Sequence, residues 1–150
     1  DEVGRRAEEA EAAARARLAA LVAGDVRFVV ERESDGAVAG RRADASLRIL
    51  DTVTGPKVHP TARLDLHGHD TASATREIAR FVRDSSQKSA RIVLIVHGKG
   101  LHSEGGLGVL ADLVVETLTR SAISSRIVAF ATASPRLGGL GAMVVRLGAG

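Results

Sequence analysis

The chain has 150 residues, of which 45% are hydrophobic and 26% charged, a balance typical of one soluble globular domain with an extension. Because the sequence contains no cysteine, disulfides, thiolate zinc sites and cysteine nucleophiles are excluded. Aromatic residues make up only 2%, so a platform on which nucleic-acid bases stack is nearly excluded. The longest apolar run is Ile92 to Val96, far below the roughly 18 residues of a membrane span.

The net charge of +3 is unevenly distributed along the chain. Residues 1–85 carry 14 Lys and Arg against 15 Asp and Glu, whereas residues 86–150 carry 7 against 3. The basic second half fits a polyanionic partner such as nucleic acid, although this signal is weak by itself. The N-terminus has no signal-peptide pattern, so we expect a cytoplasmic protein without membrane contact.

Residues 1–60 are predicted to form an N-terminal extension. Over residues 5–23, apolar side chains recur at spacings of three and four, which predicts an amphipathic helix. Most of that stripe is alanine, so it buries little area. We expect the helix to pack on the body of the protein, with a dimerising coiled coil as the alternative.

The remainder of the extension is predicted to contain a β-hairpin and a linker. The side chains of residues 26–42 alternate in the pattern typical of a β-hairpin. Asp35-Gly36 favours a two-residue type I′ turn between its two strands. Residues 47–50 are expected to form a third short extended segment. Residues 52–60 contain two prolines and a glycine, which indicates a linker, and we place the domain boundary there.

From residue 61 to residue 150, predicted strands and helices alternate. Helices are expected over residues 71–84 and 107–121, and strands over residues 63–67, 91–96, 127–130 and 142–147. The order βαβαββ predicts an α/β fold of the two-layer α+β sandwich type, with a mixed sheet.

Histidines cluster where the first two of these strands end. His67, His69, His97 and His102 lie at or after their C-terminal ends, where ligands bind in open α/β sheets. Asp65 and His67 share one face of the first strand, since side chains two residues apart point the same way. A carboxylate beside an imidazole suits general acid–base chemistry. The alternative is that Asp65 caps a loop and His67 only hydrogen-bonds to it.

Two glycine-rich segments accompany the histidines. His97-Gly98-Lys99-Gly100 places backbone N–H groups beside a cation, which suits a phosphate, although a plain strand-to-helix connection has the same composition. The segment from Arg136 to Gly141 predicts a tight turn that lies against the other two segments. Arg136 either contacts phosphate or stands free in solvent. We predict no structural metal site and no required cofactor, and leave a catalytic Mg²⁺ or Mn²⁺ open.

In this order the three segments resemble the small MutS-related (Smr) domain. The resemblance covers residues 62–147 and is carried by Leu64-Asp65-Leu66-His67-Gly68, His97-Gly98-Lys99-Gly100-Leu101-His102-Ser103, and Gly138-Gly139-Leu140-Gly141-Ala142 with Val144-Val145-Arg146-Leu147. It implies a fold similar to the C-terminal domain of bacterial translation initiation factor three. It also implies an endonuclease that cleaves or nicks DNA or RNA phosphodiesters.

The resemblance implies that Asp65, His67 and the loop from His97 to Gly100 take part in cleavage or substrate binding, and the chemistry of these residues predicts a mechanism. Asp65, His67 and His97 are expected to be catalytic: His67, oriented by Asp65, activates water or a ribose 2′-hydroxyl, and His97 or His102 protonates the leaving oxygen. Lys99 and the N–H groups around Gly98 and Gly100 are expected to stabilise the transition state. Nucleic-acid or phosphate contacts are expected from Gly68, His69, Gly98, Lys99, Gly100, His102, Arg136, Gly138, Gly139 and Gly141.

Two alternative functions that involve no cleavage stay open at this point. A non-catalytic module that binds nucleic acid or the ribosome would use the same basic second half without cutting. A protein-interaction domain would use the N-terminal helix and hairpin. The choice between DNA and RNA, the oligomeric state, and the docking of the extension on the sheet edge also stay open.

Overall fold

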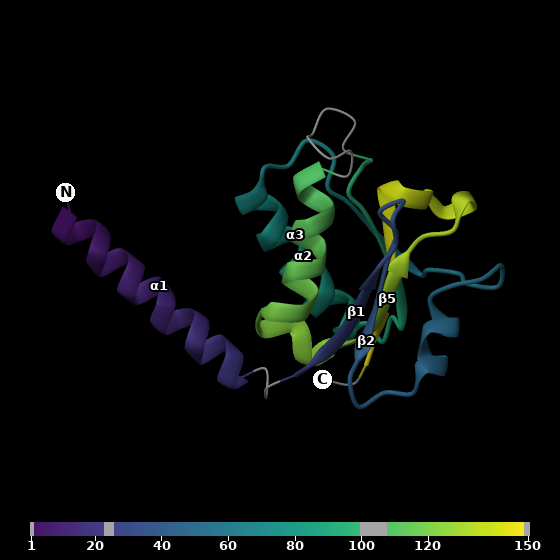
Figure 1. Cartoon of the computed structure of the whole chain (residues 1–150), viewed down its shortest axis with the longest axis horizontal. Coiled ribbons are helices and arrows are strands. Elements are labelled where there is room, and N and C mark those ends of the chain that lie inside the picture. Colours follow the sequence, from purple (N-terminus) through teal and green to yellow (C-terminus); the bar gives the residue numbers. More distant parts are fainter. Residues whose placement is uncertain (1, 23–25, 100–107, 149–150) are drawn as a thin grey trace.

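The computed structural model describes residues 2–22, 26–99 and 108–148. Six strands form one mixed sheet in the order β1-β2-β5-β6-β4-β3 (Figure 1). Their bounds are Phe28–Arg32 (β1), Val38–Arg42 (β2), Ala62–Asp65 (β3), Ile92–Val96 (β4), Ile127–Thr132 (β5) and Ala142–Leu147 (β6). Strands β3 and β4 pair in parallel and the other neighbours pair antiparallel. The predicted α+β fold with a mixed sheet is confirmed.

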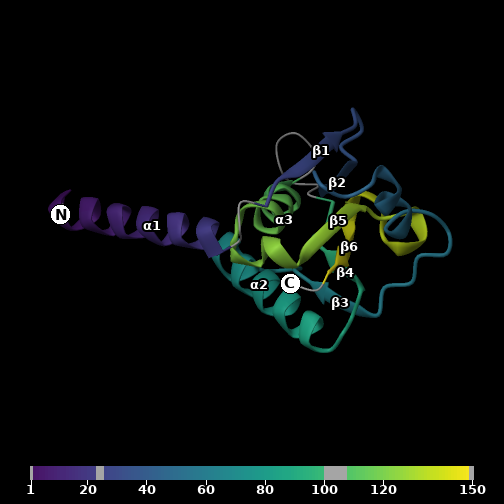
Figure 2. The ribbon, with the colours of Figure 1, turned by 90° about the horizontal axis from the view of Figure 1, so that it is seen from below.

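Two helices cover one face of this sheet, as Figure 2 shows. They are α2 (Thr71–Gln87) and α3 (Gly108–Arg120), and both lie within a few residues of their predicted bounds. Helix α2 begins where it does because the Asp70 carboxylate accepts the Ser73 N–H at 2.8 Å, which satisfies one of the free donors of the first turn. The buried positions of α2 (Ala74, Ile78, Val82 and Ser85) recur at helical spacing on the side facing the sheet.

The N-terminal helix α1 (Glu2–Val22) projects away from this two-layer body (Figures 1 and 2). Its side chains from Val3 to Arg15 are exposed. Ion pairs one helical turn apart run along it, Arg15 to Glu11 at 3.2 Å among them. The expectation that this helix packs on the body is therefore wrong over residues 3–15, because an alanine stripe offers too little apolar area to hold it there.

The predicted hairpin is part of the main sheet. Strand β2 pairs with β5, so the extension docks on the sheet edge as extra strands, and the linker does not divide the chain into separate sheets. The turn differs from the prediction. Glu33 N–H donates to the Ala37 carbonyl at 2.8 Å, which leaves a three-residue loop. Within it only Gly36 takes a positive φ, of 98°, whereas a type I′ turn needs two such residues.

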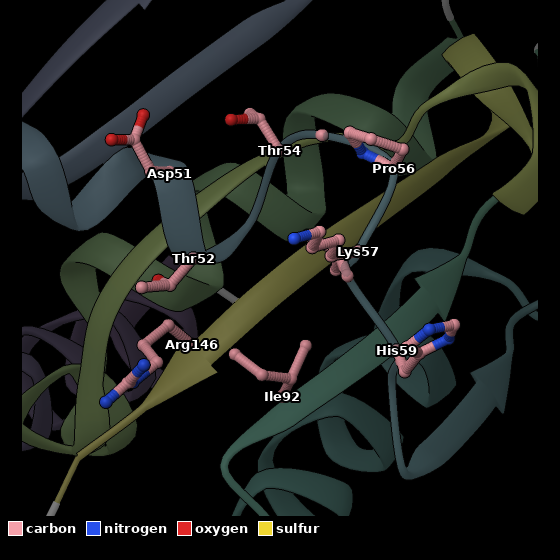
Figure 3. Close-up of a pocket in the computed structure, with 10 residues that line it drawn as sticks. Asp51, Thr52, Thr54, Pro56, Lys57, His59, Ile92 and Arg146 are labelled. Atoms are coloured by element: carbon pink, nitrogen blue, oxygen red, sulfur yellow. The ribbon is translucent and has the colours of Figure 1, made fainter.

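The opposite face of the sheet is covered by a short helix and the linker (Figure 3). Residues Leu47–Thr52 form the 3-10 helix η1, so the extended segment expected at 47–50 is wrong. Ser46 caps this helix by accepting the Arg48 N–H at 3.2 Å, a local bond that favours helix over strand. Beyond it, Val53 and Val58 are buried against Leu94 and Val144 of the sheet.

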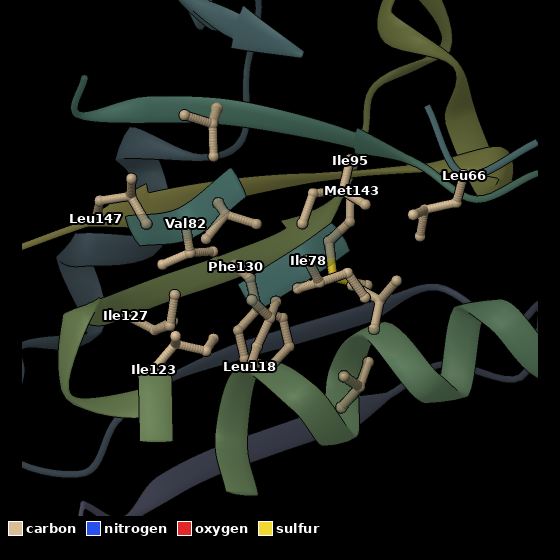
Figure 4. Close-up of a cluster of buried hydrophobic side chains, with 14 of the residues drawn as sticks. Leu66, Ile78, Val82, Ile95, Leu118, Ile123, Ile127, Phe130, Met143 and Leu147 are labelled. Atoms are coloured by element: carbon tan, nitrogen blue, oxygen red, sulfur yellow. The ribbon is translucent and has the colours of Figure 1, made fainter. Parts of the chain in front are cut away.

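The main core lies between the sheet and the two helices (Figure 4). Its largest fully buried side chains come from every layer and include Leu66, Ile78, Ile95, Leu118 and Phe130. Phe130 of β5 also packs against the extension, at Phe28 and Gly40. A Cβ atom placed on Gly40 of β2 would lie 2.2 Å from Phe130 Cζ, so glycine is required where the ring crosses the strand.

We therefore expect Gly40→Ala to cost about 1–3 kcal/mol of unfolding free energy, because the added methyl overpacks the ring. Urea denaturation measures this cost. In a Phe130→Leu background the same substitution should cost less, since the smaller side chain leaves room for the methyl. Equal costs in the two backgrounds would show that the ring is not the obstacle.

Candidate functional site

The three predicted segments meet at the end of the sheet where β3 and β4 finish. Leu66 N–H donates to the Val96 carbonyl at 2.8 Å, which extends the parallel pairing beyond β3. The N–H groups of His97 and Gly98 both donate to the Gly141 carbonyl, at 2.9 and 3.0 Å. The third segment therefore lies against the second, as predicted.

Close approach explains one glycine of the third segment. A Cβ atom on Gly141 would lie 3.3 Å from Lys99 Cγ and 3.5 Å from the Lys99 nitrogen. Gly138 and Gly139 have φ values of 123° and 56°, so the tight turn with positive φ that the sequence predicts is confirmed. The turn places the Gly141 carbonyl within hydrogen-bonding distance of the loop that follows β4.

Asp65 contacts the backbone of His67. Its Oδ1 accepts the His67 N–H at 2.8 Å, and both residues are exposed. Gly68, with a φ of 82°, and a bond from the His69 N–H to the Leu66 carbonyl at 3.0 Å complete this turn. The carboxylate therefore positions His67 through the main chain, which agrees with the alternative in which Asp65 caps a loop.

His69 and Asp70 belong to the start of α2. His69 Nδ1 lies 3.1 Å from Ser73 Oγ, and this half-buried ring is tied to the first helical turn. Hydrogen bonds from Ser73 hold the pKa of the Asp70 carboxyl below its usual range. The predicted contact between His69 and a phosphate stays a prediction.

His97 is the buried histidine of the site, with 7% of its surface exposed. Its Nδ1 lies 2.8 Å from the Gly98 carbonyl oxygen. A carbonyl can only accept, so Nδ1 carries the hydrogen and Nε2 keeps a lone pair. Burial lowers the pKa of His97, which favours the neutral ring. A neutral imidazole with a free lone pair can accept a proton at neutral pH.

Several of the predicted phosphate donors belong to the loop after β4. The Gly98 N–H donates to the Gly141 carbonyl and is therefore already paired, and its predicted role in the transition state stays a prediction. Lys99 is exposed and keeps its cation at the site. Gly100 and His102 lie outside the described residues, so their predicted roles stay predictions.

Arg136 has a partner that the sequence did not indicate. Its Nη2 donates to the carbonyl oxygens of Pro56 and Val58, at 2.9 and 2.5 Å. This guanidinium therefore fastens the linker to the glycine-rich turn, and the predicted contact of Arg136 with phosphate stays a prediction. No local pattern could have revealed the contact with the linker, because the partners lie about eighty residues away in the sequence.

Across residues 2–22, 26–99 and 108–148, no group of three or more His, Asp or Glu side chains is placed to hold a metal ion. The helices of this described part are also too short or too polar to cross a membrane.

A family model described as the Smr domain matches residues 64–148. An uncharacterized protein from Treponema pallidum (strain Nichols) is 46% identical over 55 residues, which are 37% of this chain and 27% of that relative's length. The match therefore spans only about a quarter of the curated relative.

Two solved structures align with this chain. YdaL, a stand-alone small MutS-related protein from Escherichia coli, aligns with a TM-score of 0.55 and 24% identity over 81% of this chain and 83% of its own. The Smr domain of Thermus thermophilus MutS2 aligns with a TM-score of 0.49 and 28% identity over 59% of this chain and 99% of its own. The YdaL alignment supports the same arrangement of strands and helices.

The contact of Asp65 with the main chain predicts different effects for two substitutions. Asn retains an oxygen that can accept the His67 N–H, so Asp65→Asn should unfold at nearly the wild-type temperature. Asp65→Ala removes the acceptor and should cost about 1 kcal/mol. Thermal unfolding compares the two variants, and equal losses in both would contradict the turn-capping role.

The burial of His97 predicts a pH dependence of stability. In the unfolded chain its imidazole takes up a proton near its ordinary pKa of 6.5, whereas in the folded protein it does so only at lower pH. The unfolded state therefore binds more protons in that window, and stability falls as the pH drops below about 6.5. We expect His97→Asn to remove part of this decline in urea titrations, and a variant that keeps the full wild-type decline would contradict this role of His97.

Proposed function

Because the chain belongs to the Smr domain family, we propose that it is an endonuclease that cleaves or nicks DNA or RNA at the ends of β3 and β4. The family is associated with nuclease activity and nucleic-acid binding. The observation that carries the proposal for this chain is the fixed tautomer of His97. Its Nδ1–H is held by the Gly98 carbonyl, next to the exposed cation of Lys99.

In the proposed reaction, His97 Nε2 takes the proton from a water molecule or a ribose 2′-hydroxyl. The oxygen that loses this proton forms a new bond to phosphorus, and the bond from phosphorus to the leaving oxygen breaks. The exposed imidazole of His67 delivers a proton to that oxygen. These roles are the reverse of those expected from the sequence, because burial favours the neutral form of His97.

Lys99 and Asp65 support this chemistry in different ways. The Lys99 ammonium neutralises the charge that builds on the phosphoryl oxygens in the transition state. Asp65 acts as a positioning residue, since its carboxylate holds the main chain of His67. A divalent cation is a further proposal that the cleavage assay addresses by comparing Mg²⁺ with EDTA.

One observation favours a second candidate function, a module that binds nucleic acid or the ribosome without cutting. The hydrogen bond that Asp65 makes goes to the His67 backbone, not to its imidazole, so the predicted pairing of carboxylate and ring is not formed in this contact. Binding through Lys99 and the basic second half needs no such pairing.

Cleavage of end-labelled structured RNA and of supercoiled plasmid tests the proposal, with each substrate in Mg²⁺ and in EDTA. His67→Ala should lower the rate by about 10²–10⁴-fold, the usual contribution of a general acid, while binding affinity is unchanged. The control Arg83→Ala, at an exposed position on the helix side of the sheet, should cut at the wild-type rate. If the wild type binds both substrates and cuts neither, the binding module replaces the nuclease.

A further inference from the structure

A pocket lies on the sheet face opposite the helices (Figure 3). It encloses about 520 Å³ between η1, the linker and the adjoining ends of β4 and β6. Ile92, on its floor, precedes His97 by five residues of strand and loop, a distance of about 16 Å at the usual rise per residue. The pocket is therefore separate from the candidate site and near the other end of the sheet.

Cationic and titratable side chains from distant parts of the chain converge on this pocket. Lys57 and His59 come from the linker, and Arg146 comes from β6, where it pairs with Ile92. Asp51 is the one carboxylate among the lining residues. Within residues 2–22, 26–99 and 108–148, Lys57 and Arg146 have no ion pair or hydrogen bond to their charged groups. Both charges are thus available to a ligand.

The position of Lys57 is fixed by the contact that the sequence did not reveal. Arg136 donates to the carbonyls of Pro56 and Val58, the residues on either side of Lys57. Val58 is also buried against the sheet, with 7% of its surface exposed. The linker is therefore held at the pocket from both sides of Lys57, which lowers the entropy cost of binding there.

The remaining lining suits a nucleotide. The pocket falls within the roughly 300–1,000 Å³ of sites that hold small organic ligands. Ile92 and Pro56 offer apolar surface to a base, and two cations suit a phosphate. The Thr52 and Thr54 hydroxyls donate to helix carbonyls at 2.6 and 2.9 Å, so their oxygens can accept from a base or sugar.

Strand β3 connects the pocket to the candidate site. Ala62 and Leu64 pack against the core under the helices, so Arg63 and Asp65 lie on the same sheet face as the pocket. β3 is the edge strand of the sheet, so no further strand of the sheet pairs along its outer side. An exposed cation, Arg63, thus lies between His59 at the pocket and His67 at the candidate site.

We infer that a single strand of nucleic acid follows β3 on this face and places one nucleotide, several residues from the scissile phosphate, in the pocket with its phosphate at Lys57 and Arg146. The inference rests on the proposed function, because it extends the binding surface of that same substrate. It assigns the linker of the extension a direct part in substrate binding.

Fluorescence anisotropy with labelled oligonucleotides of about 4 and 12 nucleotides, a range typical of single-strand sites, tests the inference. Lys57→Gln with Arg146→Gln should weaken binding of the longer strand about tenfold and lower the salt-dependence slope by about 0.7, equal to one lost phosphate contact. The shorter strand reaches across the roughly 16 Å between the two sites only when fully extended, so its binding at the candidate site should change much less.

Arg83→Gln with Lys88→Gln removes the same charge from exposed positions on the helix side and serves as the matched control. If both double variants lower affinity and slope equally, the effect is one of net charge and the inference is overturned. Lys57→Glu alone, at an exposed linker position, gives a second variant should Arg146→Gln disturb β6. Wild-type affinity in Lys57→Glu would also overturn it.

The cleavage assay separates this inference from the proposed function. If the wild type cuts neither substrate, but substitution of Lys57 and Arg146 still lowers the salt-dependence slope of binding, the inference about the pocket is supported and the nuclease proposal fails. If His67-dependent cleavage occurs and the Lys57 and Arg146 variant binds as the control does, the nuclease stands and the pocket fails.

Discussion

The carbonyl oxygen of Gly141 accepts two N–H groups, those of His97 and Gly98, and the candidate site depends on this arrangement. It fixes the course of the loop after β4 and brings the glycine-rich turn against it. It also leaves the Gly98 carbonyl 2.8 Å from His97 Nδ1, which sets the tautomer of the ring. A contact between backbones therefore determines which nitrogen of a side chain can take part in chemistry.

The extension is held by the sheet, because β2 pairs with β5. Its linker in turn covers the sheet face opposite the helices. Gly40 allows β2 to cross the Phe130 ring, and Arg136 fastens the linker beside the glycine-rich turn. Together these contacts place Lys57 over the sheet, on the face along which we propose that a single strand reaches the candidate site. Helix α1, by contrast, contributes no comparable burial over residues 3–15.

Much of the fold could be predicted because periodicity is a local property. The final strand, residues 142–147, has its predicted bounds, and α2 extends only three residues beyond them. The predictions were wrong where competing local hydrogen bonds, or contacts with residues distant in the sequence, determine the structure. Ser46 turns residues 47–52 into a 3-10 helix, and Gly36 alone takes a positive φ in the hairpin turn. In the site, the meeting of the three segments was predictable, whereas the use of the Gly98 N–H and the Arg136 contacts was not.

The rate of single-turnover cleavage as a function of pH tests the central claim most directly. If neutral His97 is the base, the rate should persist as the pH falls through 6.5, the ordinary pKa of histidine, and should decline only at lower pH. On lowering the pH, a rate that has already halved at or above pH 6.5 would contradict the account, as would a His97→Asn variant with the wild-type profile.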